Sequence, residues 1–272
     1  MTRPPGRQSV KARLEQEAAE LAAAERRGRM KLAAAAVAAV LLLVVVVVAL
    51  GPFSDPTDGA EKTTVAGVEL SGIPETRKKL TGVPQDGTLL GDPAAPVTIH
   101  EFADLKCPAC QQYEVQRQPQ NVDELVRTGK ANVRIHLINI IDQGHGTTDG
   151  VGLRNAAHNL AATDKLWPFL SLAYYNQGPE NDEWATEKRL RELAAGAPGV
   201  GASAINLRET STSRTLNAAA DELARRLEVR GTPSFYVQPR GTDTYEKVDD
   251  PVDGLGDAVA DATKNAKPAP TR

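Results

Sequence analysis

The 272-residue chain has only two cysteines, so it is not a small fold held together by several disulfide bonds. Its formal net charge is −3, from 32 Lys and Arg against 35 Asp and Glu, which gives no reason to expect a nucleic-acid partner. Glycine and proline are not in excess either, since 22 Gly and 18 Pro exclude a collagen-like or wholly disordered chain. The length allows one domain with a real core, together with appendages.

One long apolar run stands out, because residues 32–50 contain only Leu, Ala and Val. At about 1.5 Å per residue, these 19 residues nearly span a ~30 Å hydrocarbon core. Residues 1–31 carry eight basic residues against four Glu, and half of the basic residues lie in the last six positions. By the positive-inside rule, the sequence predicts a cytoplasmic basic leader, a transmembrane anchor over 32–50 and a main part outside the membrane.

A cleaved signal peptide is the rival interpretation of this region. The leader is long for a signal peptide and the apolar run exceeds the usual length of roughly 7–15 residues, so an uncleaved anchor is favoured. Residues 51–86 mix Pro, Gly, Asp, Thr and Lys without a sustained period, which predicts an extracytoplasmic linker. A folded domain is therefore expected over residues 87–265, followed by a tail over 266–272.

Hydrophobic periodicity predicts an α/β domain. Strand-like alternation at Val97–Phe102 and Val133–Ile138 flanks a helical stretch, Pro108–Thr128, which Pro119 should kink or split. This order predicts a βαβ unit with parallel strands. A helical block follows over about 149–228, and then a ββα unit. The expected elements are helices at Val151–Ala162, Leu166–Tyr175, Trp184–Ala195 and Arg214–Leu227, strands at Ser234–Gln238 and Thr244–Val248, and a last helix at Val252–Ala262.

Both cysteines belong to one motif, Cys107-Pro108-Ala109-Cys110, at the predicted junction of a strand and a helix. Pro108 suits the first helical position, so the Cys107 sulfur would face free helix N–H groups and the positive end of the helix dipole. Both favour the thiolate, and cysteines in such motifs have pKa values of about 3.5–7.5 rather than ~8.5. Cys107 is therefore predicted to be the nucleophile or leaving group, and Cys110, one turn inside, the less accessible partner.

Three interpretations of this pair compete. A zinc site needs two further ligands, but there is no other cysteine, and His145 and His158 are too far apart for the usual spacing. A static disulfide between residues three apart closes too small a loop to stabilise much. Redox exchange is favoured, and a location outside the cytosol supports it.

The motifs together resemble a known family. Residues 91–104, the Cys107–Cys110 motif and Gly231-Thr232-Pro233-Ser234-Phe235 are similar to the active-site segments of DsbA-like thiol–disulfide oxidoreductases, especially the BdbD-like members. The resemblance covers about residues 89–262 and implies a thioredoxin fold with a helical insertion. It also implies disulfide formation in exported proteins, and reoxidation by a membrane partner of the DsbB or vitamin K epoxide reductase-like type. No cofactor besides the redox-active Cys107–Cys110 disulfide is expected.

Further site residues follow from the resemblance. It implies a cis Thr232–Pro233 bond, with backbone groups beside the sulfurs free to hold an extended substrate, although a plain turn is the alternative. Thr232 and Pro233, with Pro108 and Ala109, are the substrate-binding candidates. Glu101 corresponds to a buried carboxylate beneath the disulfide and is a candidate proton relay for Cys110; an exposed residue on an edge strand is the equal alternative.

Other residues carry weaker expectations. Asp104 is a lesser candidate for the relay, and the four histidines show no partner pattern. Ala109 replaces the His of the most oxidising DsbA proteins, which leaves the redox strength open, and the sequence does not reveal the potential that sets the direction of the reaction. A reductase or isomerase and a non-catalytic binding module therefore remain alternatives to an oxidase. Five aromatic residues at helical spacing are expected in the core: Trp167, Phe169, Tyr174, Tyr175 and Trp184.

Overall fold

The computed structural model describes residues 55–269, so the predicted leader and anchor, together with residues 270–272, lie outside the described residues. Within 55–269, no helix is long and apolar enough to cross a membrane.

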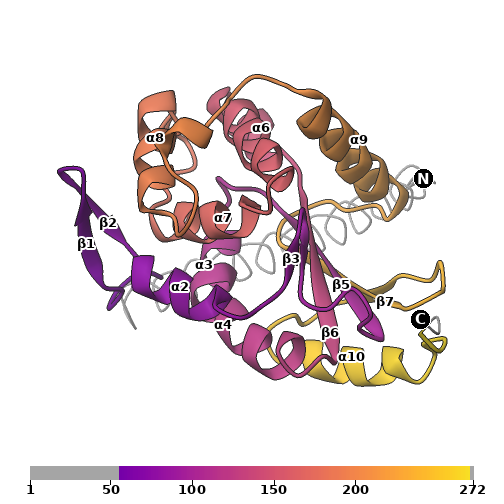
Figure 1. The fold of residues 1–272 in the computed structure, drawn as a ribbon. Helices are drawn as coiled ribbons and strands as arrows, with labels where there is room; N and C mark the ends of the chain where they lie inside the picture. The colour runs from indigo at the N-terminus through magenta and orange to yellow at the C-terminus, as the bar shows by residue number, and fades with distance from the viewer. Residues whose placement is uncertain (1–54, 270–272) are drawn as a thin grey trace, which may run out of the picture. The chain divides into compact units, whose positions relative to one another are not determined.

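A six-stranded mixed sheet forms the centre of the domain, in the order β3-β4-β6-β5-β7-β8 (Figure 1). The parallel pair β5 and β6 lies in the middle, and every other neighbouring pair is antiparallel. The strands are β3 (Gln85–Asp86), β4 (Leu89–Leu90), β5 (Val97–Ala103), β6 (Ala131–Leu137), β7 (Ser234–Pro239) and β8 (Glu246–Val248). The predicted βαβ and ββα units therefore share one sheet.

Strand β5 is buried on both faces, because alternate side chains of a strand point to opposite sides of the sheet. Val97 and Ile99 belong to the main core, which also contains residues of α10 (Leu255–Thr263). Phe102 belongs to a second, smaller core on the other face, which α9 (Ser211–Arg226) covers. Helices α9 and α10 accordingly lie on opposite sides of the sheet in Figure 1.

The helical stretch after β5 is split, as Pro119 predicts. Helix α3 (Pro108–Gln116) ends at Arg117, and α4 (Gln118–Asn121) continues into a π-helical turn, Val122–Val126. Pro119 occupies the first turn of α4, where its missing N–H costs no hydrogen bond.

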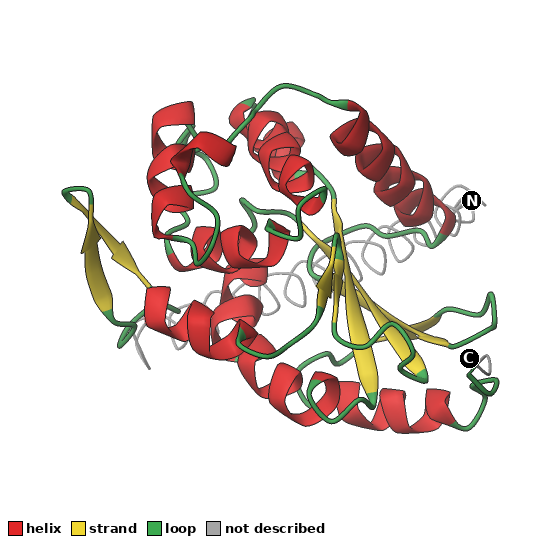
Figure 2. Cartoon of the chain, in the orientation of Figure 1, coloured by secondary structure: helices red, strands yellow, loops and turns green. Residues whose placement is uncertain are grey.

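A block of helices lies between the βαβ and ββα units in the chain. Figure 2 shows most of it as a group of helices beyond one end of the strands, whereas α9 covers one face of the sheet. Its members are α5 (Ile141–His145), α6 (Asp149–Ala161), α7 (Leu166–Tyr175), α8 (Glu187–Gly196) and α9. The aromatic residues of α7 lie in the core as expected, with Trp167, Phe169 and Tyr174 fully buried. Trp184 is partly buried against the same core.

The expectation that folded structure begins only near Gly87 is wrong for the part of the linker that the structure describes. Strands β1 (Lys62–Val65) and β2 (Val68–Ser71) form a hairpin, and α2 (Ile73–Leu80) follows. Leu70 is fully buried in the main core. A Cβ at Gly72 would lie 2.1 Å from Cγ of the Tyr175 ring, and Gly72 also has a φ of 83°. The segment therefore packs tightly on α7.

The hydrophobic pattern does not predict α2, because several of its buried residues are polar. Helix α2 turns Thr76 and Lys79 inward together with Ile73 and Leu80. The Thr76 and Ser171 hydroxyls are 3.1 Å apart, and Lys79 finds a buried carboxylate. An analysis of hydrophobic periodicity does not treat Thr76 or Lys79 as a core position, although both are buried in the fold.

Candidate active site

The loop Asp104–Cys107 carries the first cysteine from β5 to α3. The Cys107 N–H donates to the Asp104 carbonyl oxygen at 3.0 Å, and Cys107 is the N-cap of α3 with Pro108 in the first turn. The thiol donates to the Thr232 carbonyl oxygen at 3.3 Å. Cys107 therefore lies at the helix N-terminus, as the motif predicts.

The two thiols, both free in this structure, have opposite electrostatic environments. A hydrogen bond from the Cys110 thiol, helped by the N–H groups of Cys110 and Ala109, lowers the pKa of Cys107 to about 6 against the opposing effect of burial. Burial and the neighbouring Cys107 raise the pKa of Cys110 well above its usual value. Cys107 is 5% exposed and Cys110 is 0% exposed. The acidic, reachable sulfur is that of Cys107.

The substrate-binding candidates lie together around this sulfur. Pro108 and Ala109 are exposed at the start of α3, and Thr232 and Pro233 are joined by a cis peptide bond. Ala109 and Pro233 line a groove of about 300 Å³, together with Gln112, Tyr113, Gln116, Arg117, Pro251 and Val252. The buried Thr232 hydroxyl has no hydrogen-bond partner in the described part of the chain.

Glu101 is fully buried on the central strand β5, so the alternative of an exposed edge residue is wrong. Burial and the nearby Glu114 raise the pKa of its carboxyl group well above the usual value, with Lys79 opposing. Gln118 donates to Oε2 at 3.3 Å, while Oε1 has no partner among the described residues. None of the hydrogen bonds of residues 55–269 joins this carboxyl group to either sulfur.

A buried ion pair beside Glu101 was not predicted. Lys79 of α2 donates to Glu114 of α3 at 2.7 Å, with both side chains no more than 3% exposed. Gln118 bridges the two carboxylates, because its amide also lies 3.5 Å from Glu114 Oε1. Glu114 lies on the buried face of α3, seven residues after Cys107. Lys79 lies in the segment that the sequence predicts to be a linker, so no sequence signal connects the two residues.

Asp104 has a different role from the one considered for it. Its Oδ1 accepts the Lys106 N–H at 2.9 Å, and its Oδ2 accepts the N–H groups of Ile140 and Ile141 at 2.8 and 3.0 Å. Burial raises the pKa of this carboxyl group, and these backbone bonds oppose the rise. Asp104 therefore braces the loop before Cys107.

Two of the histidines without a sequence pattern are partners in space. Nδ1 of His100 on β5 lies 2.9 Å from Nε2 of His136 on β6, and the two rings stack. They are near the second core, on the face of the sheet that α9 covers. No group of three His, Cys, Asp or Glu side chains within residues 55–269 is arranged to hold a metal ion.

Comparison with known proteins places this geometry in a family. The family model described as thioredoxin matches residues 84–253. A probable disulfide bond formation protein D of Bacillus cereus is 31% identical over 151 residues, which are 54% of this chain and 68% of that protein. The chain belongs to this family of DsbA-like thiol–disulfide oxidoreductases.

Further relatives agree with the fold of this oxidoreductase. Disulfide bond formation protein D of Bacillus subtilis is 25% identical over 164 residues, covering 60% of this chain and 72% of that one. The crystal structure of oxidised BdbD from Bacillus subtilis superposes with a TM-score of 0.56 at 20% identity, covering 67% of this chain and 97% of that chain. The Wolbachia pipientis α-DsbA1 structure gives 0.52 at 16% identity, covering 68% and 93%. The predicted thioredoxin fold with a helical insertion is confirmed.

Proposed function

We propose that this oxidoreductase forms disulfide bonds in exported proteins, with Cys107 as the sulfur that reacts with substrate. The contrast between the two thiols carries the proposal, since the pKa of Cys107 is lowered to about 6 and that of Cys110 is raised. A dithiol with one stabilised thiolate favours the reduced enzyme, and an enzyme that prefers to be reduced oxidises its clients.

The reaction takes two exchange steps. A client thiolate attacks the Cys107 sulfur of the oxidised enzyme, the Cys107–Cys110 bond breaks, and the Cys110 sulfur leaves and takes up a proton. A second client thiolate then attacks the client sulfur of the mixed disulfide and displaces the Cys107 thiolate. The client loses two electrons, and the enzyme gains them as a dithiol.

Glu101 is the proposed donor of the proton that Cys110 takes up. The buried Cys110 sulfur cannot remain a thiolate, because burial raises its pKa. Glu101 is the buried carboxyl group on the strand that leads to the motif, its pKa is raised, and its Oε1 has no other partner among the described residues. Because no direct bond joins the two, the transfer needs an intervening water molecule or a side-chain shift.

Substrate is assigned to the surface formed by Pro108, Ala109, Thr232 and Pro233. Pro108 and Ala109 follow Cys107 directly in α3, the Cys107 thiol contacts the Thr232 carbonyl oxygen, and Ala109 and Pro233 line the same groove. An extended client segment would lie along the backbone at Thr232 as a short added strand.

The location and the recycling partner rest on the N-terminal sequence. The apolar residues 32–50 and the basic leader support a single membrane anchor with the redox domain outside. A quinone-linked membrane protein of the DsbB or vitamin K epoxide reductase-like type would then accept the two electrons. Protease added to intact spheroplasts should digest residues 62–269, and protection until lysis would contradict this orientation.

The direction of exchange is tested by the thiol state in cells. Acid quenching followed by an alkylating reagent should find Cys107 and Cys110 mainly as a disulfide if the protein is an oxidase. A reductase or isomerase would be found mainly as a dithiol. A binding module would keep its function after both cysteines are changed to Ser.

A further inference from the structure

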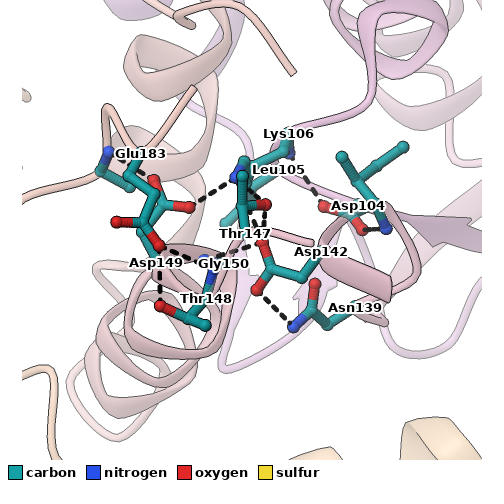
Figure 3. Close-up of polar contacts among 12 residues, drawn as sticks. Asp104, Leu105, Lys106, Asn139, Asp142, Thr147, Thr148, Asp149, Gly150 and Glu183 are labelled. Atoms are coloured by element: carbon teal, nitrogen blue, oxygen red, sulfur yellow. Dashed lines mark hydrogen bonds and ion pairs between the residues drawn. The ribbon is translucent and has the colours of Figure 1, made fainter. Parts of the chain in front are cut away.

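Lys106, the residue immediately before Cys107, has a fully buried side chain. Its ammonium group lies among side chains of the segment that begins the helical insertion, as Figure 3 shows. Burying a charged lysine costs folding free energy unless the ammonium group is paired and hydrogen-bonded.

Three oxygen atoms surround the Lys106 ammonium. It donates to Asp142 Oδ1 at 3.1 Å, to the Thr147 hydroxyl at 2.7 Å and to Asp149 Oδ1 at 2.5 Å (Figure 3). Asp142 belongs to α5, and Asp149 is the first residue of α6. All three partners therefore come from the segment that opens the insertion.

Both carboxylates are themselves held in place. Asn139 donates to Asp142 Oδ2 at 3.0 Å, and the Thr147 hydroxyl donates to Asp142 Oδ1 at 2.7 Å. The Ala185 N–H, in the loop before α8, donates to Asp149 Oδ2 at 2.8 Å. These bonds leave the ammonium a single well-defined position.

The backbone of the same loop is bound to the insertion as well. Gln177 donates to the carbonyl oxygens of Leu105 and Cys107 at 2.8 and 3.2 Å, and the Tyr174 hydroxyl donates to that of Asp104 at 3.2 Å. Asp104 binds the first N–H groups of α5, and Lys106 supplies the only ion pairs of this loop with α5 and α6 among residues 55–269.

We propose that Lys106 is a positioning residue for the redox reaction. Its ion pairs with Asp142 and Asp149 fix the loop Asp104–Cys107 against the helical insertion, and so hold the Cys107 sulfur at the N-terminus of α3 beside Thr232. The insertion is thereby part of the redox site rather than only a cover over the fold. This inference rests on the proposed function, in which Cys107 is the reacting sulfur.

The contribution of Lys106 is one of geometry. The groups that lower the pKa of Cys107 include the Cys110 thiol and the N–H groups of Cys110 and Ala109, and the Lys106 charge is not among them. These short-range bonds depend on where the sulfur lies. A loosened loop therefore weakens them and raises the pKa of Cys107, although no charge near the sulfur has changed.

The test measures the Cys107 thiolate by its absorbance near 240 nm as a function of pH, on the reduced full-length chain in detergent. We expect Lys106→Met to raise the pKa of Cys107 by about one unit or more from its value of about 6. At pH 5 such a rise lowers the thiolate fraction roughly tenfold. The Cys107 thiolate attacks a disulfide and displaces one of its sulfurs, so the rate at which the reduced protein forms a mixed disulfide with a disulfide-bonded model peptide should fall with it.

Lys106→Met leaves two buried carboxylates without a cation, so a milder variant accompanies it. Asp149→Asn keeps Asp142 for the ammonium and should give a smaller rise in the same direction. The matched control is Arg154→Met, which breaks the 2.7 Å ion pair between α6 and Asp221 of α9 without touching the loop. It should lower stability and leave the titration of Cys107 unchanged.

The proposal is overturned if folded Asp149→Asn, or folded Lys106→Met, titrates like the wild type. It is also overturned if Arg154→Met shifts the titration equally, because the effect would then be a general loosening. The readout is the thiol itself, so a wild-type protein that failed to oxidise clients would refute the proposed function and leave this result interpretable.

Discussion

The two sides of the redox helix α3 are built differently. The open side, formed by Cys107, Ala109, Thr232 and Pro233, uses backbone groups and few charges. The buried side, formed by Cys110, Glu101, Glu114 and Lys79, has three ionisable groups besides the thiol in a place without solvent. The difference indicates a division of work: the open side stabilises a thiolate by hydrogen bonds, and the buried side manages protons by pairing charges.

The largest expected effect comes from replacing the two cysteines, one on each side of α3. Cys107→Ser should abolish exchange with clients, because the reachable sulfur is lost. Cys110→Ser should accumulate mixed disulfides, because the trapped client sulfur has no internal thiol to displace it. Non-reducing gels of cell extracts measure both, and trapping by Cys107→Ser alone would reverse the assigned roles.

The next effect falls on the buried side. Lys79→Met leaves Glu114 buried without its cation, which should lower the free energy of unfolding by about 3–5 kcal/mol. The double change Lys79→Met with Glu114→Gln should recover most of this loss, because no unpaired charge remains. Denaturant titration of the three proteins measures it. Equal stability of the single and double variants would show that the pair is not desolvated as described.

Acid should lower the free energy of unfolding through a third region, which contains three largely buried histidines. Burial lowers the pKa of His100, His136 and His158 to about 4, 3 and 4, from 6.5. The unfolded chain therefore binds more protons below pH 6.5, and the free energy of unfolding falls as the pH drops toward 4. We expect a loss of roughly 1–2 kcal/mol per histidine between pH 7 and pH 5.

Denaturant titrations at several pH values check this loss. His158→Gln should reduce the loss of unfolding free energy between pH 7 and pH 5 by about one third, because it removes one of the three largely buried histidines while leaving a hydrogen-bond donor for Asn217. A stability that does not change between pH 7 and pH 5 would contradict the burial of these rings.

The smallest expected effect concerns Glu101 on the buried side. Glu101→Gln keeps the shape of the side chain but removes the acidic proton that we propose is passed to Cys110. Formation of the mixed disulfide should therefore slow by about tenfold, with little change in the pKa of Cys107. Stopped-flow measurements over a range of pH distinguish the two quantities. A variant with wild-type rates at every pH would exclude Glu101 from proton transfer.

Much of the open side was predictable, because its signals are local. Cys107, Pro108 and Cys110 are neighbours in sequence, and the N-cap position of Cys107 follows from Pro108, which suits the first position of a helix. Burial of Glu101 was an even choice, since alternation along β5 gives its face but not whether β5 is central or at an edge. The order of the strands decided that question.

The sequence by itself determined the strands β5 to β8, most of the helices and the redox motif, because these depend on residues within a few positions of one another. It did not predict β1 to β4. Only the tertiary structure decided which ionisable side chains meet. Lys79 finds Glu114 at a separation of 35 residues, Lys106 finds Asp149 at 43 and His100 finds His136 at 36. A buried lysine looks like a surface lysine in the sequence, since its cost is offset only by a partner that folding brings to it.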